Sequence, residues 1–220
     1  MTDTTATAAA ATTTDTGTRR LVVSEFVTLD GYIVGPDEDV SWVAVGFDPQ
    51  MQDDLASHLA DTVDLFVFGR VTYDIFAAYW PHAVAYDEGD EPRPAEGKED
   101  PRIIRALNER PKVVFSTTLG ELGWANTRVV SHGVEDEIRR LTDEPGRAIA
   151  VQGSASIVQA LARADLVDEY QLYLHPVVLG RGTPLFTEGH DRQDFELTTL
   201  TRYANGVIAT TYERKDGSPR

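Results

Sequence analysis

Two glycine-containing segments in this 220-residue chain combine residue types that bind anions. Gly69, Arg70 and Thr72 come directly after one short apolar run, and Gly153 and Ser154 follow another. A glycine lets the backbone turn sharply into a helix, whose first N–H groups and dipole favour an anion. Each turn therefore predicts a phosphate site, and two such turns on neighbouring strands of one sheet are what a dinucleotide requires.

Each motif also has a simpler interpretation. Arg70 is then an ordinary surface arginine, and Ser154 is an ordinary helix cap after a tight turn. The position of Arg70 favours the anion site, because it is the only Lys or Arg between Leu21 and Pro92. The hydroxyl groups of Ser116 and Thr117, after a third apolar run, are only supportive because hydroxyls cap turns so often.

Asp30 and Gly31 follow the first apolar run of the chain. Asp-Gly is a common turn, and the simplest interpretation is nothing more than that. A carboxylate at this point, on the same side as the phosphate turns, is also able to orient a heterocycle or relay a proton. Both interpretations stay open from these two residues alone.

The charge of the chain excludes several classes of partner. It contains 20 Lys and Arg against 36 Asp and Glu, a net charge of −16. Residues 1–102 hold 6 basic and 20 acidic side chains, so this part alone contributes 6 − 20 = −14. Such a surface repels nucleic acids and anionic membranes. The absence of cysteine excludes disulfides, thiolate zinc sites and cysteine nucleophiles.

Strand-like and helix-like segments alternate and position these turns. The predicted strands are 21–27, 65–68, 112–116, 127–130, 148–151, 170–174, 195–197 and 207–212, and the predicted helices are 49–60, 71–80, 134–141 and 154–164. The last three strands have no helices between them, which predicts an α/β fold with a mostly parallel sheet and an antiparallel C-terminal edge. We expect one domain over residues 19–214, a disordered tail over 1–18, a flexible C-terminus over 215–220 and a solvated acidic loop over 84–102.

No segment is apolar enough for a secretory signal or a membrane helix, so a cytoplasmic protein is expected.

The order of the motifs carries a family resemblance. They are Leu29–Ile33, Gly69–Tyr73, Pro111–Ser116 with the following Trp124–Thr127, Gly153-Ser154, and Val177–Phe186. In this order they resemble the dihydrofolate reductase-like family formed by the C-terminal reductase domain of the bifunctional riboflavin-biosynthesis deaminase/reductase and its stand-alone relatives. The resemblance covers roughly residues 20–213 and implies a three-layer fold with helices on both faces of the sheet.

The resemblance also implies NADPH as the cofactor and assigns residues to it. The implied cofactor-binding residues are Gly69, Arg70, Thr72, Ser116, Thr117, Val151, Gly153, Ser154, Ala155 and Ser156. Arg70 and Thr72 would meet the adenosine 2′-phosphate and the pyrophosphate. The implied substrate-side residues are Asp30, Gly31, Leu179 and Gly180, with Asp30 in the catalytic role, and no metal is implied.

The function implied by the resemblance is hydride transfer from NADPH to a C=N or C=O of a small heterocyclic substrate, as in 5-amino-6-(5-phosphoribosylamino)uracil reductase. Relatives commonly pair through their C-terminal strands, which favours a homodimer. The alternatives are a non-catalytic NADPH-binding dimer that acts as a sensor, and a structural acidic protein. A zinc deaminase half is not expected, because the five histidines have no cysteine partners for a zinc site. In true dihydrofolate reductases an acid on the first helix holds the pterin, but Asp53 and Asp54 are expected in a solvated first turn of a helix, so folate reductase activity is not expected.

Overall fold

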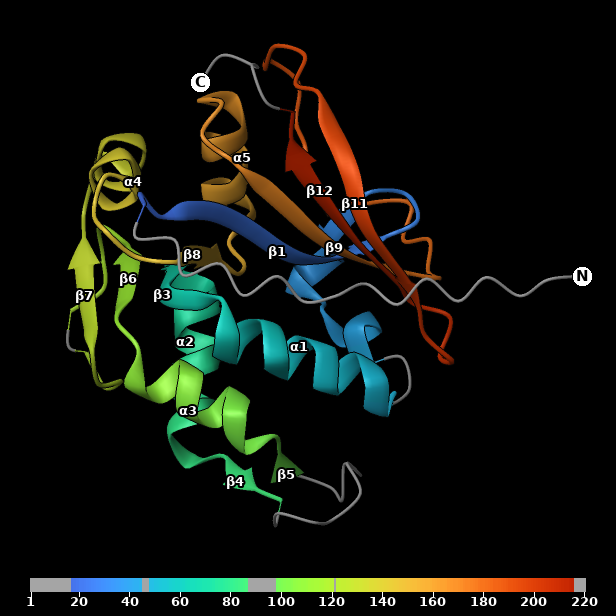
Figure 1. Ribbon diagram of the computed structural model, residues 1–220, viewed down its shortest axis with the longest axis horizontal. Helices are drawn as coiled ribbons and strands as arrows, with labels where there is room; N and C mark the ends of the chain where they lie inside the picture. Colours follow the sequence, from blue (N-terminus) through green and yellow to red (C-terminus); the bar gives the residue numbers. More distant parts are fainter. Residues whose placement is uncertain (1–16, 45–47, 87–97, 121, 216–220) are drawn as a thin grey trace, which may run out of the picture.

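A computed structural model describes residues 17–44, 48–86, 98–120 and 122–215 (Figure 1). The predicted disordered tail lies outside these residues except for positions 17 and 18. Residues 87–97 of the predicted acidic loop and residues 216–220 of the predicted flexible C-terminus also lie outside them. Within the described ranges, no helix is both long and apolar enough to cross a membrane.

The centre of the fold is an eight-stranded sheet in the order β11-β12-β9-β1-β8-β3-β6-β7. Its parallel strands are β1 (Arg20–Thr28), β3 (Val63–Gly69), β6 (Lys112–Phe115), β7 (Thr127–Val130), β8 (Ala148–Val151) and β9 (Glu169–His175). Two antiparallel strands complete the C-terminal edge, β12 (Ile208–Arg214) and β11 (Phe195–Arg202). The predicted mostly parallel sheet with an antiparallel C-terminal edge is confirmed.

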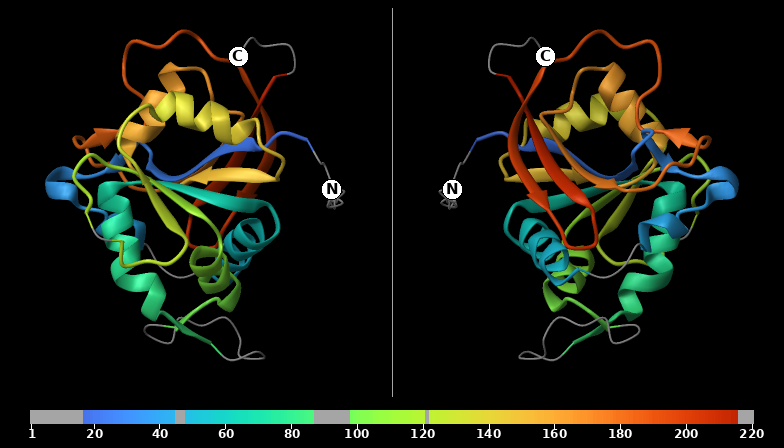
Figure 2. Two further views of the ribbon diagram at one scale, coloured as in Figure 1. Left: turned by 90° about the vertical axis from the view of Figure 1, so that its left-hand side faces the viewer. Right: turned by 90° about the vertical axis from the view of Figure 1, so that its right-hand side faces the viewer.

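Helices cover both faces of this sheet, which makes three layers (Figure 2). Core residues of α4 (Val134–Thr142) and α5 (Ala155–Arg163) pack on one face. Core residues of α1 (Pro49–Asp61), α2 (Arg70–Tyr79) and α3 (Pro101–Glu109) pack on the other. The expected helices on both faces are therefore present, and the apolar periodicity of each helix explains which side it buries.

The periodicity located most elements correctly. All eight predicted strands and all four predicted helices are present, and the helix ends differ from the prediction by one residue at most. β11 is longer than predicted, since it continues to Arg202 rather than stopping at Leu197. The short elements were not predicted: β2 (Tyr32–Val34) pairs with β10 (Thr183–Pro184), and the 3-10 helices η1 (Pro36–Glu38), η2 (Ser41–Ala44) and η3 (Trp80–His82) flank α1 and α2.

The prediction of a solvated loop over 84–102 is wrong at its C-terminal end, where α3 begins. Asp100 is 3% exposed and caps this helix by accepting a hydrogen bond from the Arg102 N–H at 2.7 Å. Pro101 occupies the first helical position, and Ile103 and Leu107 bury the helix against the sheet. The acidic composition of 84–102 obscured this Asp-Pro start signal, which is typical of a helix N-terminus.

The two ends of the same segment are held together. Short strands β4 (Val84–Ala85) and β5 (Lys98–Glu99) pair with each other, and the Tyr86 N–H donates to the Glu99 carbonyl at 3.2 Å. The Tyr86 hydroxyl donates to Asp100 at 2.6 Å, and Tyr79 donates to Glu99 at 2.5 Å. The described ends of this segment are thus fixed to α2 and α3.

Candidate functional site

The two glycine turns lie against each other, as their sequence motifs predict. β3 and β8 are parallel neighbours with Val67 opposite Val151, so their carboxyl ends reach the same edge of the sheet. A Cβ atom on Gly69 would lie 1.9 Å from the Ser154 Oγ, and one on Gly153 would lie 2.4 Å from the Thr72 Oγ1. Each turn therefore requires a glycine because the other turn occupies the space.

The backbone of the second turn is unusual. Gly153 and Ser154 are both left-handed, with φ of +68° and +65°. This conformation is easy for glycine but costs a residue such as serine on the order of 1 kcal/mol or more. The contact of Ser154 with Gly69 helps to hold it there, and the resulting turn leads directly into the N-terminus of α5.

A cavity of about 380 Å³ opens at this edge. It is formed where β8, β3, β6 and β7, four adjacent parallel strands, reach their carboxyl ends. Its walls combine one arginine with many hydroxyl groups and a few apolar side chains. The lining residues are Gly69, Arg70, Val71, Phe115, Ser116, Thr117, Thr118, Val130, Ser131, His132, Val134, Ser154, Ser156 and Ile157.

Six of the ten residues predicted for the cofactor line this cavity: Gly69, Arg70, Ser116, Thr117, Ser154 and Ser156. Thr72 and Gly153 lie in the packed contact between the turns, while Val151 ends β8 and Ala155 begins α5. The sequence prediction missed Ser131 and His132. They follow the predicted strand 127–130, so the search of strand ends that located the other turns would have found them.

Arg70 is the basic side chain of the cavity wall. Its guanidinium is about half exposed and pairs with Asp74 one helical turn away, at 2.9 Å. An exposed pair of this kind contributes roughly 0.3–0.5 kcal/mol, so an anion in the cavity is able to compete for the arginine. The N-termini of α2 and α5 add the partial positive charge of their unpaired N–H groups.

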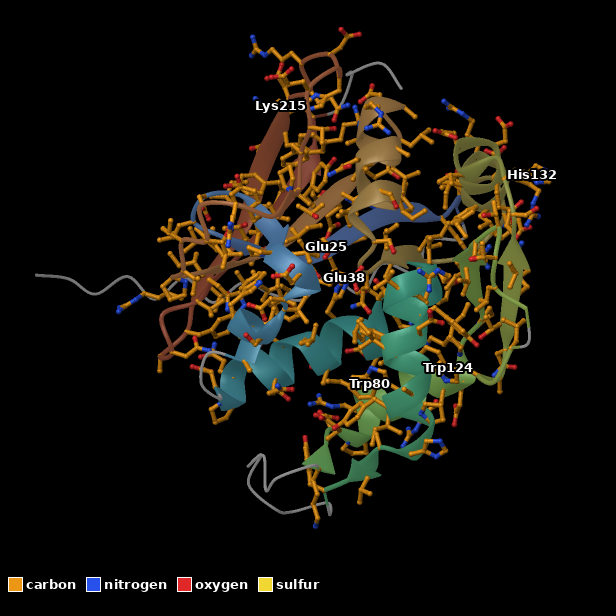
Figure 3. All side chains as sticks on the ribbon, turned by 180° about the vertical axis from the view of Figure 1, so that it is seen from behind. Glu25, Glu38, Trp80, Trp124, His132 and Lys215 are labelled. Atoms are coloured by element: carbon orange, nitrogen blue, oxygen red, sulfur yellow. The ribbon has the colours of Figure 1, made fainter. Side chains whose placement is uncertain are left out.

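The neighbouring hydroxyl groups are held in defined positions. The Ser116 Oγ accepts hydrogen bonds from the Thr118 and Leu119 N–H groups at 3.2 and 2.9 Å, which fixes the loop after β6. After β7, the Ser131 Oγ lies 2.7 Å from the His132 Nδ1. Figure 3 shows His132 at the outer edge of the molecule, on the β7 side of the cavity. Small polar groups thus follow the ends of two adjacent parallel strands and line the same side of the cavity.

The four predicted substrate-side residues come together in a second group. Asp30 accepts hydrogen bonds from the Leu179 and Gly180 N–H groups at 3.1 and 2.7 Å. The Thr28 hydroxyl donates to the same carboxylate at 2.7 Å. These hydrogen bonds, that of Thr28 first, lower the pKa of Asp30, so it is ionised at neutral pH and fixes the 177–180 loop to the end of β1. Gly31 supports this turn with a left-handed φ of +81°.

A buried acid behind the second glycine turn was not predicted. Glu25 on β1 is 8% exposed, and its Oε1 accepts a hydrogen bond from the Gly153 N–H at 2.6 Å. Burial raises the pKa of its carboxyl group from 4.5 to about 8, and the Gly153 hydrogen bond opposes this in part. A glutamate within a mostly apolar strand was a visible signal, because acids are rarely buried unless they are paired.

An aromatic cluster lies on the opposite face of β1 and β9. His175 is fully buried and packs edge-on against Phe26 and Trp42, with ring centroids 5.3 Å away in both cases. Neither its ring nitrogens nor the Trp42 Nε1 has a hydrogen-bond partner among the described residues. Burial lowers the pKa of His175, which keeps its ring neutral. The polar residues of this cluster were also missed by sequence reasoning.

The prediction for the first turn of α1 needs correction. Asp53 is exposed, as expected, and pairs with Arg102 at 2.7 Å. Asp54 is half-buried and accepts a hydrogen bond from the Tyr203 hydroxyl at 2.9 Å. Its carboxylate therefore joins α1 to the turn before β12 instead of facing solvent.

Comparison with known proteins identifies the family. The profile of the RibD C-terminal domain matches residues 19–209. This chain belongs to the RibD C-terminal domain family. Two relatives from Bacillus subtilis (strain 168), YyaP and YwjB, are 28% and 26% identical to it over 195 and 189 residues. These alignments cover 88% and 86% of this chain, and 94% and 95% of the relatives.

Solved structures place this RibD C-terminal domain among dihydrofolate reductase-like folds. A protein from Shewanella sp. PV-4 assigned to riboflavin biosynthesis superposes with a TM-score of 0.65 at 23% identity, covering 89% of this chain and 99% of that one. Dihydrofolate reductase from Enterococcus faecalis superposes with a TM-score of 0.55 at 14% identity, covering 90% and 97%. The Thermotoga maritima deaminase/reductase gives 0.59 at 14% identity, covering 90% of this chain and 57% of that longer one.

Proposed function

We propose that this protein is an NADPH-dependent reductase that transfers a hydride to a C=N or C=O group of a small heterocyclic substrate. The observation that carries the proposal is the cavity at the ends of four parallel strands, with Arg70, several hydroxyl groups and two helix N-termini around it. Such walls suit the phosphates and ribose of a dinucleotide. Family membership supports an oxidoreductase of this kind.

The names of structural neighbours point in the same direction. The Enterococcus faecalis dihydrofolate reductase was solved in complex with NADP(H). The Thermotoga maritima protein carries the name 5-amino-6-(5-phosphoribosylamino)uracil reductase. The residues present here fit such a cofactor, because Arg70 and the hydroxyl groups of Ser116, Thr117 and Ser154 line the cavity beside the N-termini of α2 and α5.

The protein's own residues would bind and orient the reactants. Arg70 would hold the 2′-phosphate, with Ser116 and Thr117 beside it, and the Gly153–Ser154 turn would hold the pyrophosphate. When bound, NADPH supplies the hydride from C4 of its nicotinamide ring. Asp30, ionised and bound to the 177–180 loop, would act as a hydrogen-bond acceptor that orients the substrate.

Replacement of Arg70 tests the cofactor assignment. Arg70→Ala should weaken NADPH binding more than tenfold and NADH binding much less, since only NADPH carries the 2′-phosphate. The dissociation constants are measured by fluorescence titration. Arg105→Ala, which removes an exposed arginine on α3, is the matched control and should leave both constants unchanged. Equal losses for both cofactors would refute the 2′-phosphate role of Arg70.

Turnover separates a reductase from a cofactor-binding sensor. NADPH oxidation is followed with a panel of pteridines, flavins, quinones and pyrimidine intermediates. Oxidation that depends on one member of the panel supports the reductase. Tight NADPH binding without turnover on any compound would instead favour the non-catalytic binding dimer.

We also propose that the chain forms a homodimer through its C-terminal strands. The pairing register shifts between Leu197 and Thr199, which places Leu197 and Leu200 on the same face of β11. Their exposed fractions are 45% and 59%, an unusual apolar exposure on an edge strand. Light scattering should report a dimer, and Leu200→Glu should shift it towards the monomer. A monomeric wild-type protein at tens of micromolar would refute this assignment.

A further inference from the structure

Glu25 lies at the centre of the molecule, in the middle of the sheet (Figure 3). Its strand, β1, runs between β8 and β9, and Glu25 is opposite Leu172 of β9. Val23 and Val27, two residues away on either side, belong to the core shared with α5. Because side chains alternate along a strand, the Glu25 carboxyl group points to this same face.

The carboxyl group supports the turn that would receive the cofactor phosphate. Val23 is opposite Val151 in the β1–β8 pairing, and Glu25 therefore extends to the level of Gly153. The hydrogen bond of 2.6 Å from the Gly153 N–H joins them directly. Ser154, the next residue, lines the cavity. The acid is thus separated from the cavity wall only by this turn.

Burial keeps this acid neutral at pH 7, because it raises the Glu25 pKa to about 8. Burial and the Gly153 hydrogen bond set this pKa, and no charged side chain of the described residues contributes to it. Tyr170 of β9 lies on the same face but interacts with Arg214 and Asp165, and Glu38 of η1, labelled next to Glu25 in Figure 3, is exposed.

Several other charged or titratable groups are engaged elsewhere or lie distant along their elements. Arg20, at the start of β1, pairs with Glu169 and Glu213; Arg70 and Asp74 on α2 pair with each other. Asp30 is held by the 177–180 loop, and His175 lies on the opposite face of β9. On α5, Arg163 is at the C-terminal end.

We propose that Glu25 is a positioning residue that couples cofactor binding to the uptake of a proton. This inference rests on the proposed function, because it takes the ligand of the Gly153–Ser154 turn to be NADPH. A neutral carboxylic acid supports the turn without opposing an anion there. An ionised Glu25 repels the cofactor phosphate through the thin wall of the turn, where low-dielectric surroundings strengthen the interaction.

Linkage makes this coupling reciprocal. If deprotonation of Glu25 weakens NADPH binding by about tenfold, bound NADPH lowers the acid dissociation constant of Glu25 by the same factor of about ten. At pH 8.5, where free Glu25 is mostly ionised, binding should then take up roughly half a proton per NADPH. The secondary phosphate of the cofactor has a pKa of about 6 and contributes little at that pH.

Calorimetry measures the proton directly. NADPH is titrated at pH 8.5 in two buffers of different ionisation enthalpy, and the difference in observed heat gives the number of protons taken up. We expect about half a proton for the wild type and close to none for Glu25→Gln, whose carboxamide imitates the neutral acid. Glu169→Gln is the matched control, because Glu169 is also 8% exposed with a raised pKa but lies at the N-terminal end of β9, where it pairs with Arg20 and not with the Gly153 turn. It should behave as the wild type.

A second readout needs no cofactor. The NMR signal of the Gly153 amide should titrate with a midpoint near pH 8 in the wild type and lose this step in Glu25→Gln. The inference would be overturned if the wild type and Glu25→Gln took up the same number of protons per NADPH bound, or if the Gly153 amide signal did not titrate. Either result would leave the cofactor assignment unaffected. Failure of all three proteins to bind NADPH would refute the proposed function, and this coupling with it.

Discussion

The turns after β3 and β8 reach the same cavity, but they are built differently. At the first, Gly69 has an ordinary extended backbone with φ of −84°, and its lack of a side chain is required only by Ser154 opposite. At the second, Gly153 and Ser154 are both left-handed, and Thr72 also requires the glycine. Packing alone thus requires the glycine of the first turn, whereas both packing and the left-handed backbone require the glycine of the second turn.

Their charges differ in the same way. The first turn presents the cation Arg70, about half exposed and paired with Asp74 at the surface. The second rests on the buried acid Glu25. An exposed charge affects the ligand and hardly affects folding, while a buried ionisable group affects both. A change of charge at Arg70 should therefore alter ligand binding with little effect on stability, whereas a change of charge at Glu25 should alter both.

The largest expected effect concerns Glu25 and the pH dependence of stability. Its pKa of about 8 in the folded state lies above the unfolded value of 4.5, so the folded state holds the extra proton between these limits. This contribution to the free energy of unfolding is complete below pH 4.5 and is lost as the pH rises towards 8, by up to roughly 1.4 kcal/mol per pH unit.

Urea denaturation from pH 5 to pH 9 measures this slope. The difference between wild type and Glu25→Gln isolates the contribution of Glu25 from that of other groups. If the two proteins show parallel pH profiles, the second turn does not depend on a buried acid in the manner described.

A methyl group at Gly69 should disturb both turns. Gly69→Ala places a Cβ atom 2.3 Å from the Ser154 Cβ, which cannot move without its backbone, and should destabilise the protein by about 1–3 kcal/mol. Ser154→Gly removes this contact, so the double variant should recover most of the lost stability. NADPH affinity should fall in Gly69→Ala and recover in the double variant in the same way.

The control for this cycle is Gly123→Ala, where a Cβ atom would meet nothing within 4 Å. Additive effects of Gly69→Ala and Ser154→Gly in chemical denaturation would contradict the direct contact between the turns.

The smallest effect is expected from the surface pair of the first turn. Asp74→Ala frees Arg70 from its partner and removes a negative charge near the cavity. The free energy of unfolding should change by less than about 0.5 kcal/mol, and NADPH should bind two- to threefold more tightly. A large loss of stability together with weaker binding would show that the pair supports the turn structurally.

The sequence predicted the elements whose signal is local. Apolar periodicity located β3, β8 and the helices after them, and glycine followed by polar residues marked the two turns. Order and spacing of motifs then indicated the family. In the structure, all ten predicted cofactor residues lie on the two contacting turns, in the loop after β6, or directly beside them.

What the sequence did not predict depends on contacts between distant segments. Glu25 and Gly153 are 128 positions apart, so their hydrogen bond follows only from the pairing of β1 with β8. The same holds for Asp54, whose role is set by Tyr203. For α3, a local signal was present, but the acidic composition around it dominated the interpretation. Leu197 and Leu200 lie on one face of β11 only because the pairing register shifts between Leu197 and Thr199, and no local sequence pattern marks that shift.

The hydrogen bonds around the β4–β5 pair have a practical consequence for engineering. Tyr86, Glu99 and Asp100 join the two described ends of the acidic segment, so the folded core fixes the distance between those ends. Closing a longer connection costs little, about 0.6 kcal/mol for each doubling of its length. None of the joining residues lines the cavity. An epitope or a reporter domain inserted between Tyr86 and Lys98 should therefore leave these hydrogen bonds in place.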